Sequence, residues 1–308
     1  MGFTIALSNV LITLFYIFPG YIITKMKKAT TDHLPTLSAL LIYVGTPFME
    51  ISAFMSIKYT PSGLINMGIF FVITFFMQLL FILIFFFIFK TKFSDSKYRM
   101  LTIASVMGNV GFFGLPIVRA LFPENPEVTA YSTIFAVSMN ILVFTVGIFC
   151  LTGEKKYISI KSAFCNPNVF GLILALPFYF FGLKTILPSV LINAIEIIGN
   201  MTTPLCMFIL GIRLASTPLK RIFSRPIVYI IASMKLIVYP LFCYFLVYFL
   251  PIDPIIKASV LVLSATPCAA VILSLAEIHK SNAEIAANCI LITTLFCFLT
   301  IPTLTLLL

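Results

Sequence analysis

Residues 105–117 read Ser-Val-Met-Gly-Asn-Val-Gly-Phe-Phe-Gly-Leu-Pro-Ile, inside a long apolar stretch. Within nine positions this stretch contains Gly108, Asn109, Gly111, Gly114 and Pro116. Glycine has poor helix propensity and proline interrupts the hydrogen-bond ladder, so a continuous helix is disfavoured here. In lipid, the backbone groups that such a break frees need protein or water as partners. We therefore expect this segment to line a cavity or to pack against a second interrupted helix.

Residues 264–268, Ser-Ala-Thr-Pro-Cys, predict that second interruption, at Thr266 and Pro267. Two such helices can cross at the bilayer midplane, where the N-termini of the half-helices offer free N–H groups and positive dipole ends to an anion. Glycine and proline also occur in membrane helices that are merely kinked. Two breaks at equivalent places in the chain favour a binding site over simple kinks.

The composition is that of a membrane protein. Of 308 residues, 61% are hydrophobic and 10% charged, whereas about a quarter of the residues of a soluble domain are charged. The mean hydropathy is +1.13. A spanning helix needs roughly 20 apolar residues. We predict an all-α polytopic protein in the lipid bilayer with ten spans, at 4–24, 35–54, 64–89, 98–121, 129–152, 165–183, 187–211, 226–250, 255–277 and 283–307.

The net charge of +10 follows these predicted spans and does not form one patch, so nucleic acid is not expected as a partner. Fifteen basic residues fall on one predicted side: Lys25, Lys27, Lys28, Lys90, Lys92, Lys97, Arg99, Lys155, Lys156, Lys161, Arg213, Lys220, Arg221, Arg225 and Lys280. Four fall on the other side: Lys58, Arg119, Lys184 and Lys257. The positive-inside rule then predicts a multi-pass protein of the cell membrane with both termini outside.

Short matches relate the two halves of the chain. Ser8-Asn9-Val10, Leu34-Pro35 and Thr46-Pro47 correspond in order to Pro167-Asn168-Val169, Leu187-Pro188 and Thr203-Pro204. They predict a five-helix repeat over 1–152, a short cytoplasmic linker over 153–164 and a second repeat over 165–308. Because five is odd, the second repeat is inverted relative to the first. Inverted repeats with matching interrupted helices are typical of alternating-access carriers.

Other polar residues within the predicted spans extend the candidate site. Asn140 and Asn288 occupy comparable places in the two halves, and Glu50, Lys235 and Gln78 are candidates for coupling or ion pairing. A charge at the bilayer centre costs about 2.5–3.5 kcal/mol on insertion scales, so each is a functional candidate. Intramembrane Asn residues serve more often as interhelical hydrogen-bond donors and acceptors. Asn109, next to the break, is the first candidate for a substrate ligand.

No enzyme, metal site or cofactor is expected. The seven cysteines have no C-x-x-C spacing, and neither a nucleophile-elbow pattern nor a P-loop occurs. An intramembrane enzyme would need clustered acids or histidines within the spans. A membrane receptor on a transporter fold would need a signalling domain or a long loop. A secondary carrier for a small organic anion fits better than either.

At these residues the sequence resembles the auxin efflux carrier family. The resemblance rests on Gly108–Pro116, on Thr266-Pro267, on Ala276–Asn282 and on the stretches Ile292–Thr294 and Ile301-Pro302. It implies a scaffold from the spans within 4–54 and 165–211. It also implies a transport domain from 64–152 and 226–308, with spans four and nine interrupted and crossed.

The resemblance further implies elevator-type transport of a carboxylate, malate-like, malonate-like or auxin-like, by a homodimer. Proton and sodium coupling both stay open, because the related bile acid/sodium symporters share the fold. A sodium-coupled carrier of that kind is the alternative function. The predicted 153–164 linker is much shorter than the central loop of many plant auxin exporters, which favours a short bacterial-type carrier.

Overall fold

A computed structural model describes residues 2–308, and in this part of the chain the regular structure is helical. Eight helical stretches are long and apolar enough to cross a membrane: Gly2–Lys25, Thr31–Met55, Pro61–Lys92, Glu127–Thr152, Ile160–Phe181, Ser189–Ser216, Pro226–Tyr248 and Ala283–Leu307. These stretches agree with a polytopic membrane protein.

The other two predicted spans are each divided into shorter pieces. The pieces are α6 (Ser96–Ala104), a π-helical turn (Val110–Gly114) and α7 (Leu115–Leu121) for 98–121, and α17 (Pro254–Ser264) and α18 (Ala270–Ile278) for 255–277. Each of them is shorter than the roughly 20 residues that a helix needs to cross the bilayer. Helix length alone therefore gives eight spans where the apolar stretches of the sequence give ten.

Most of the remaining helices fall within predicted spans. They are α1 (Gly2–Phe15), α2 (Ile17–Lys25), α3 (Leu34–Ala39), α4 (Thr46–Met55), α5 (Pro61–Phe89), α8 (Glu127–Leu142), α9 (Ile148–Thr152), α10 (Ile160–Phe164), α11 (Pro167–Phe181), α12 (Ser189–Asn200), α13 (Thr202–Ser216), α14 (Leu219–Phe223), α15 (Pro226–Ser233), α16 (Tyr239–Tyr248) and α19 (Ala283–Leu304). However, α10 and α14 lie in the predicted connections 153–164 and 212–225.

Three of the helices contain a π-helical turn just before a proline. The turns Leu40–Gly45, Val110–Gly114 and Met234–Val238 are followed by Pro47, Pro116 and Pro240 respectively. Proline cannot donate the backbone hydrogen bond to the residue four positions earlier, so the preceding turn loosens. A fourth such turn, Val143–Gly147, has no proline after it.

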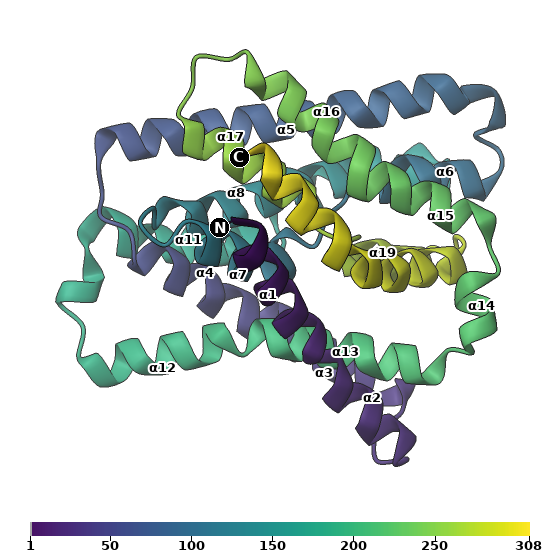
Figure 1. Ribbon diagram of the computed structural model, residues 1–308, viewed down its shortest axis with the longest axis horizontal. Helices are drawn as coiled ribbons and strands as arrows, with labels where there is room; N and C mark the ends of the chain where they lie inside the picture. The colour runs from purple at the N-terminus through teal and green to yellow at the C-terminus, as the bar shows by residue number, and fades with distance from the viewer. Residues whose placement is uncertain (1) are drawn as a thin grey trace.

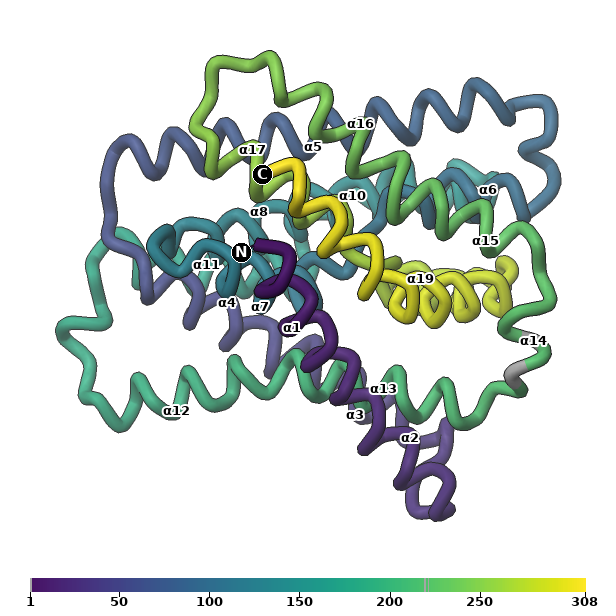
Figure 2. The backbone as a smooth tube through the Cα atoms, in the orientation of Figure 1, coloured from purple at the N-terminus to yellow at the C-terminus, as the bar shows by residue number. Residues whose placement is uncertain are grey.

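The helices pack in two sets. In the first, α2 packs against α13, and α4 packs against α11 and α12. In the second, α5 packs against α8, α16 against α17, and α15 against α19. Figure 1 shows α12 and α13 along one edge of the molecule and α5, α15 and α16 along the opposite edge. The purple α1 runs between the two edges and contacts α19, so the two termini lie close together (Figure 2).

Two glycines allow α2 and α13 to touch. A methyl group at Gly20 would fall on the carbonyl oxygen of Phe208, and one at Gly211 would fall on that of Ile17. Small residues bring membrane helices together in this way, because attraction between them comes from close packing.

Gly20→Ala and Gly211→Ala are therefore expected to lower the melting temperature of the purified protein. Each added carbon meets rigid backbone, and overpacking of this kind costs about 1–3 kcal/mol. The matched control is Gly68→Ala on α5, where an added methyl group meets nothing within 4 Å. Gly68→Ala should keep or raise the melting temperature, because alanine is the better helix former. Equal melting temperatures for all three variants would contradict the close α2–α13 contact.

Candidate functional site

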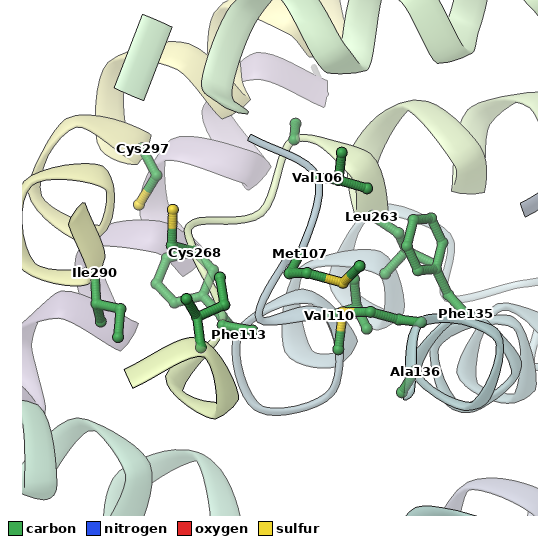
Figure 3. Packing of buried hydrophobic residues seen from close by; sticks show 14 of the residues in the cluster. Val106, Met107, Val110, Phe113, Phe135, Ala136, Leu263, Cys268, Ile290 and Cys297 are labelled. Atoms are coloured by element: carbon green, nitrogen blue, oxygen red, sulfur yellow. The ribbon is translucent and has the colours of Figure 1, made fainter. Parts of the chain in front are cut away.

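The two interrupted segments lie against each other. Between α6 and α7 the chain is non-helical over residues 105–109, and between α17 and α18 over residues 265–269. Gly108 and Cys268 face each other there in a single antiparallel bridge. Figure 3 shows the two extended segments side by side, surrounded by apolar side chains such as Phe113 and Leu263.

Backbone hydrogen bonds join the two segments. The N–H of Asn109 donates to the carbonyl of Pro267 at 2.7 Å, and the N–H of Ala269 donates to the carbonyl of Met107 at 3.1 Å. The breaks thus satisfy part of each other's freed backbone, as a buried segment in a membrane requires.

The space around the bridge is small. A methyl group at Gly108 would lie 2.5 Å from Thr266 Oγ1 and 3.1 Å from Lys235 Nζ. A larger residue at this position would force Thr266 to move, so glycine fits the close passage of the chain. Lys235 itself is fully buried, with 0% of its surface exposed.

The segment that follows the first break, residues 109–114, is hydrogen-bonded to α13. The carbonyl of Phe112 is the one that Pro116 leaves without its helical donor, and it accepts a hydrogen bond from Thr203 Oγ1 at 2.8 Å. One turn further along α13, Cys206 Sγ accepts from the side-chain amide of Asn109 at 3.8 Å. Asn109 is buried, with 7% of its surface exposed.

A cavity lined by both polar and apolar side chains lies beside Thr203 and α7. It has a volume of about 390 Å³ and is bounded by α1, α4, α7 and the α12–α13 junction. Polar side chains contribute much of its lining: Asn9, Thr13, Ser52, Arg119, Asn200, Thr202 and Thr203. A second cavity of about 290 Å³ shares three of them and extends to the loop before α8. Arg119 is the positively charged residue among those that line the two cavities.

The structure brings together several of the residues singled out from the sequence. Gly108, Asn109, Thr266, Pro267 and Lys235 meet at the bridge. Gly111 and Pro116 lie farther along the same segment. A methyl group at Gly111 would lie 3.3 Å from Met49 Cε, and both Met49 and Pro116 line the larger cavity.

Four other candidates have contacts elsewhere. The amide of Gln78 donates to Ser138 Oγ and to its own helix, joining α5 to α8. The amide of Asn140 donates to the carbonyl of Ala136 in its own helix. Glu50 on α4 lies against Gly171 of α11, and its Oε2 is buried without a hydrogen-bond donor among the described residues. Asn288 is buried on α19.

Comparison with known proteins decides the family. A family described as "membrane transport protein" matches residues 5–305 of the chain. The chain belongs to this family. The sequence-based recognition of the auxin efflux carrier family is thereby confirmed. An uncharacterized transporter of Methanocaldococcus jannaschii is 30% identical over 305 residues, which is 96% of this chain and 97% of that protein.

Membership in the membrane transport protein family means that the site is to be understood as part of a transporter. The family is one of transporters, not an enzyme class, and the helical stretches make this member a multi-pass membrane protein. Substrate therefore needs a path through the helices, and the cavity that α7 and Thr203 line, with its polar side chains, is a candidate for part of it.

Two residues of this membrane transport protein's cavity are not singled out as site residues by the sequence pattern. Arg119 falls among the basic residues of the predicted outer loops, and Thr203 belongs to a repeat match. Both line the larger cavity. Arg119 lies three residues after Pro116, which puts the two on one face of a helix. That spacing is the signal in the sequence that points to Arg119.

Proposed function

We propose that this membrane transport protein is a secondary carrier that moves a small organic anion, a carboxylate, by alternating access. The observation that carries the proposal is the cavity of about 390 Å³ with Arg119 in its lining, next to two paired helix interruptions. Its volume suits a small ligand, and a few convergent polar groups are typical of ligand sites. A guanidinium binds carboxylates with two parallel hydrogen bonds.

The helical segment from Val110 to Leu121 adds to the attraction for an anion. Its first N–H groups have no acceptor within the helix, and its N-terminal end carries a partial positive charge. Asn109 stands at that end, and among the described residues its side-chain amide donates to the weak acceptor Cys206 Sγ. We propose that this amide turns to the carboxylate when substrate is bound.

The two helix sets are proposed as the moving parts of an elevator. The scaffold comprises the spans within 4–54 and 165–211, and the transport domain comprises those within 64–152 and 226–308. In this proposal the ten spans form two inverted repeats, with spans four and nine crossed. The location of the cavity supports the division, because it is lined by α1, α4 and α13 from the proposed scaffold and by α7 from the proposed transport domain. Relative movement of the two sets would change the side from which the cavity is reached.

The proposal is tested by binding. Purified protein in detergent is titrated with di- and monocarboxylates, with amines of similar size and with neutral sugars, and its melting temperature is followed. We expect at least one carboxylate to raise the melting temperature in a saturable way, because a ligand that binds only the folded state stabilises it. Stabilisation by amines or sugars but by no carboxylate would reject an anion carrier.

The proposed topology places both termini and the loop at Glu124 outside the cell membrane and Lys156 inside. Both residues are exposed, as is the native Cys165, so Cys165 is first replaced by serine. An impermeant maleimide should label Glu124→Cys in intact cells and Lys156→Cys only after permeabilisation. Labelling of both from one side would contradict the ten-span arrangement.

A further inference from the structure

Lys235 is a buried basic residue placed at the bridge. It lies in the π-helical turn Met234–Val238, and its Nζ donates to the carbonyl of Ser264 at 2.6 Å. Nζ also lies 4.9 Å from the centre of the Tyr239 ring. Among the described residues, no carboxylate lies within 4.0 Å of it. The partners of this buried ammonium are therefore a helix end and an aromatic ring. A fully buried lysine is rare and is usually paired with a carboxylate.

The C-terminal end of α17, which accepts the hydrogen bond from Lys235, offers carbonyl oxygens that can bind a cation. Ser264 is the last residue of α17, so its carbonyl belongs to the negative end of the helix dipole and has no N–H donor within the helix. Thr266 Oγ1 and Lys235 Nζ both approach the methyl position of Gly108, at 2.5 and 3.1 Å. In carriers with discontinuous helices, carbonyls at half-helix C-termini coordinate a coupling Na⁺.

We propose that the ammonium of Lys235 is a tethered substitute for a coupling cation at this helix end. It supplies, from the turn between α15 and α16, the positive charge that a bound Na⁺ would bring to the break. The inference rests on the proposed carrier function and deepens it, because such a carrier has no need of sodium at this position. A methyl group at Gly108 would lie 2.5 Å from Thr266 Oγ1 and 3.1 Å from Nζ, so glycine leaves the space in which the ammonium sits.

The test removes the ammonium of Lys235 by mutation and adds Na⁺ to the solution. The melting temperatures of wild type, Lys235→Ala and Lys235→Met are measured in NaCl, KCl and choline chloride at one ionic strength. Wild type should be indifferent to the cation. Lys235→Ala should melt lower in choline and recover with Na⁺ in a saturable way, by about 5 °C or more at a hundred times the Kd. Lys235→Met should not recover, because its side chain fills the vacated space.

Each of the other outcomes is also decisive. Equal melting of Lys235→Ala in all three salts, or saturable stabilisation of wild type by Na⁺, would overturn the proposal. If Lys235→Ala folds only when it is prepared in Na⁺, the proposal is supported. If neither it nor Lys235→Ser folds in any salt, Na⁺ cannot replace the ammonium and the proposal fails. The melting temperatures are measured without any carboxylate. A failure of the Lys235 proposal can therefore be told apart from a failure of the proposed carrier function.

Discussion

Arg119→Gln is expected to weaken carboxylate binding by about ten- to a hundredfold. A hydrogen bond to a charged group contributes about 1.5–3 kcal/mol, and this guanidinium is the positive charge among the residues lining both cavities. Arg119→Lys should bind with intermediate affinity, since it keeps the charge and loses the two-pronged geometry. The measurement is the Kd of a radiolabelled carboxylate for the purified variants.

The control for Arg119 is Lys58→Gln. It removes the same charge from the same predicted side of the membrane, at an exposed residue that lines neither cavity. Lys58→Gln should bind carboxylate within about twofold of wild type, because exposed charges contribute little. If Arg119→Gln and Lys58→Gln bind alike, the anion does not sit against α7.

Asn109→Ala should weaken carboxylate binding by about tenfold or more, and Asn109→Asp should weaken it further. The alanine variant loses the side-chain donor but keeps the backbone hydrogen bond to Pro267, so the pairing of the two segments survives. The aspartate variant adds a negative charge that repels the substrate. Binding is measured on protein whose folding is verified by size exclusion.

Asn140→Ala is the matched comparison for Asn109→Ala. Both residues are buried amides, but Asn140 donates to a carbonyl of its own helix. We expect carboxylate affinity to change less than about twofold in Asn140→Ala. Unchanged affinity in Asn109→Ala and Asn109→Asp would show that the anion does not reach the bridge.

The sequence predicts the features whose causes are local. Gly108 and Pro267 disturb helices wherever they stand, so both interruptions can be located from the residue types alone. The apolar stretches likewise predict the eight long helices. The need to satisfy freed backbone groups in lipid then predicts that the two breaks pack against each other.

The features that escape prediction depend on contacts between distant segments. Arg119 faces a cavity only because α1, α4 and α13 complete its walls. Lys235 is an evident candidate, but its acceptor Ser264 is set by the packing of α16 against α17. Gln78 is another candidate, and its hydrogen bond to Ser138 arises from the packing of α5 against α8. No short-range pattern encodes these pairings.

Transport by reconstituted protein tests the central claim most directly. Wild type, Arg119→Gln and Lys58→Gln are placed in proteoliposomes at equal density, and uptake of a panel of radiolabelled carboxylates is compared with that of empty liposomes. We predict saturable uptake of at least one carboxylate by wild type and Lys58→Gln, and uptake near the level of empty liposomes for Arg119→Gln. Wild-type uptake no greater than that of empty liposomes for every carboxylate, or full uptake by Arg119→Gln, would contradict an anion carrier that binds its substrate in this cavity.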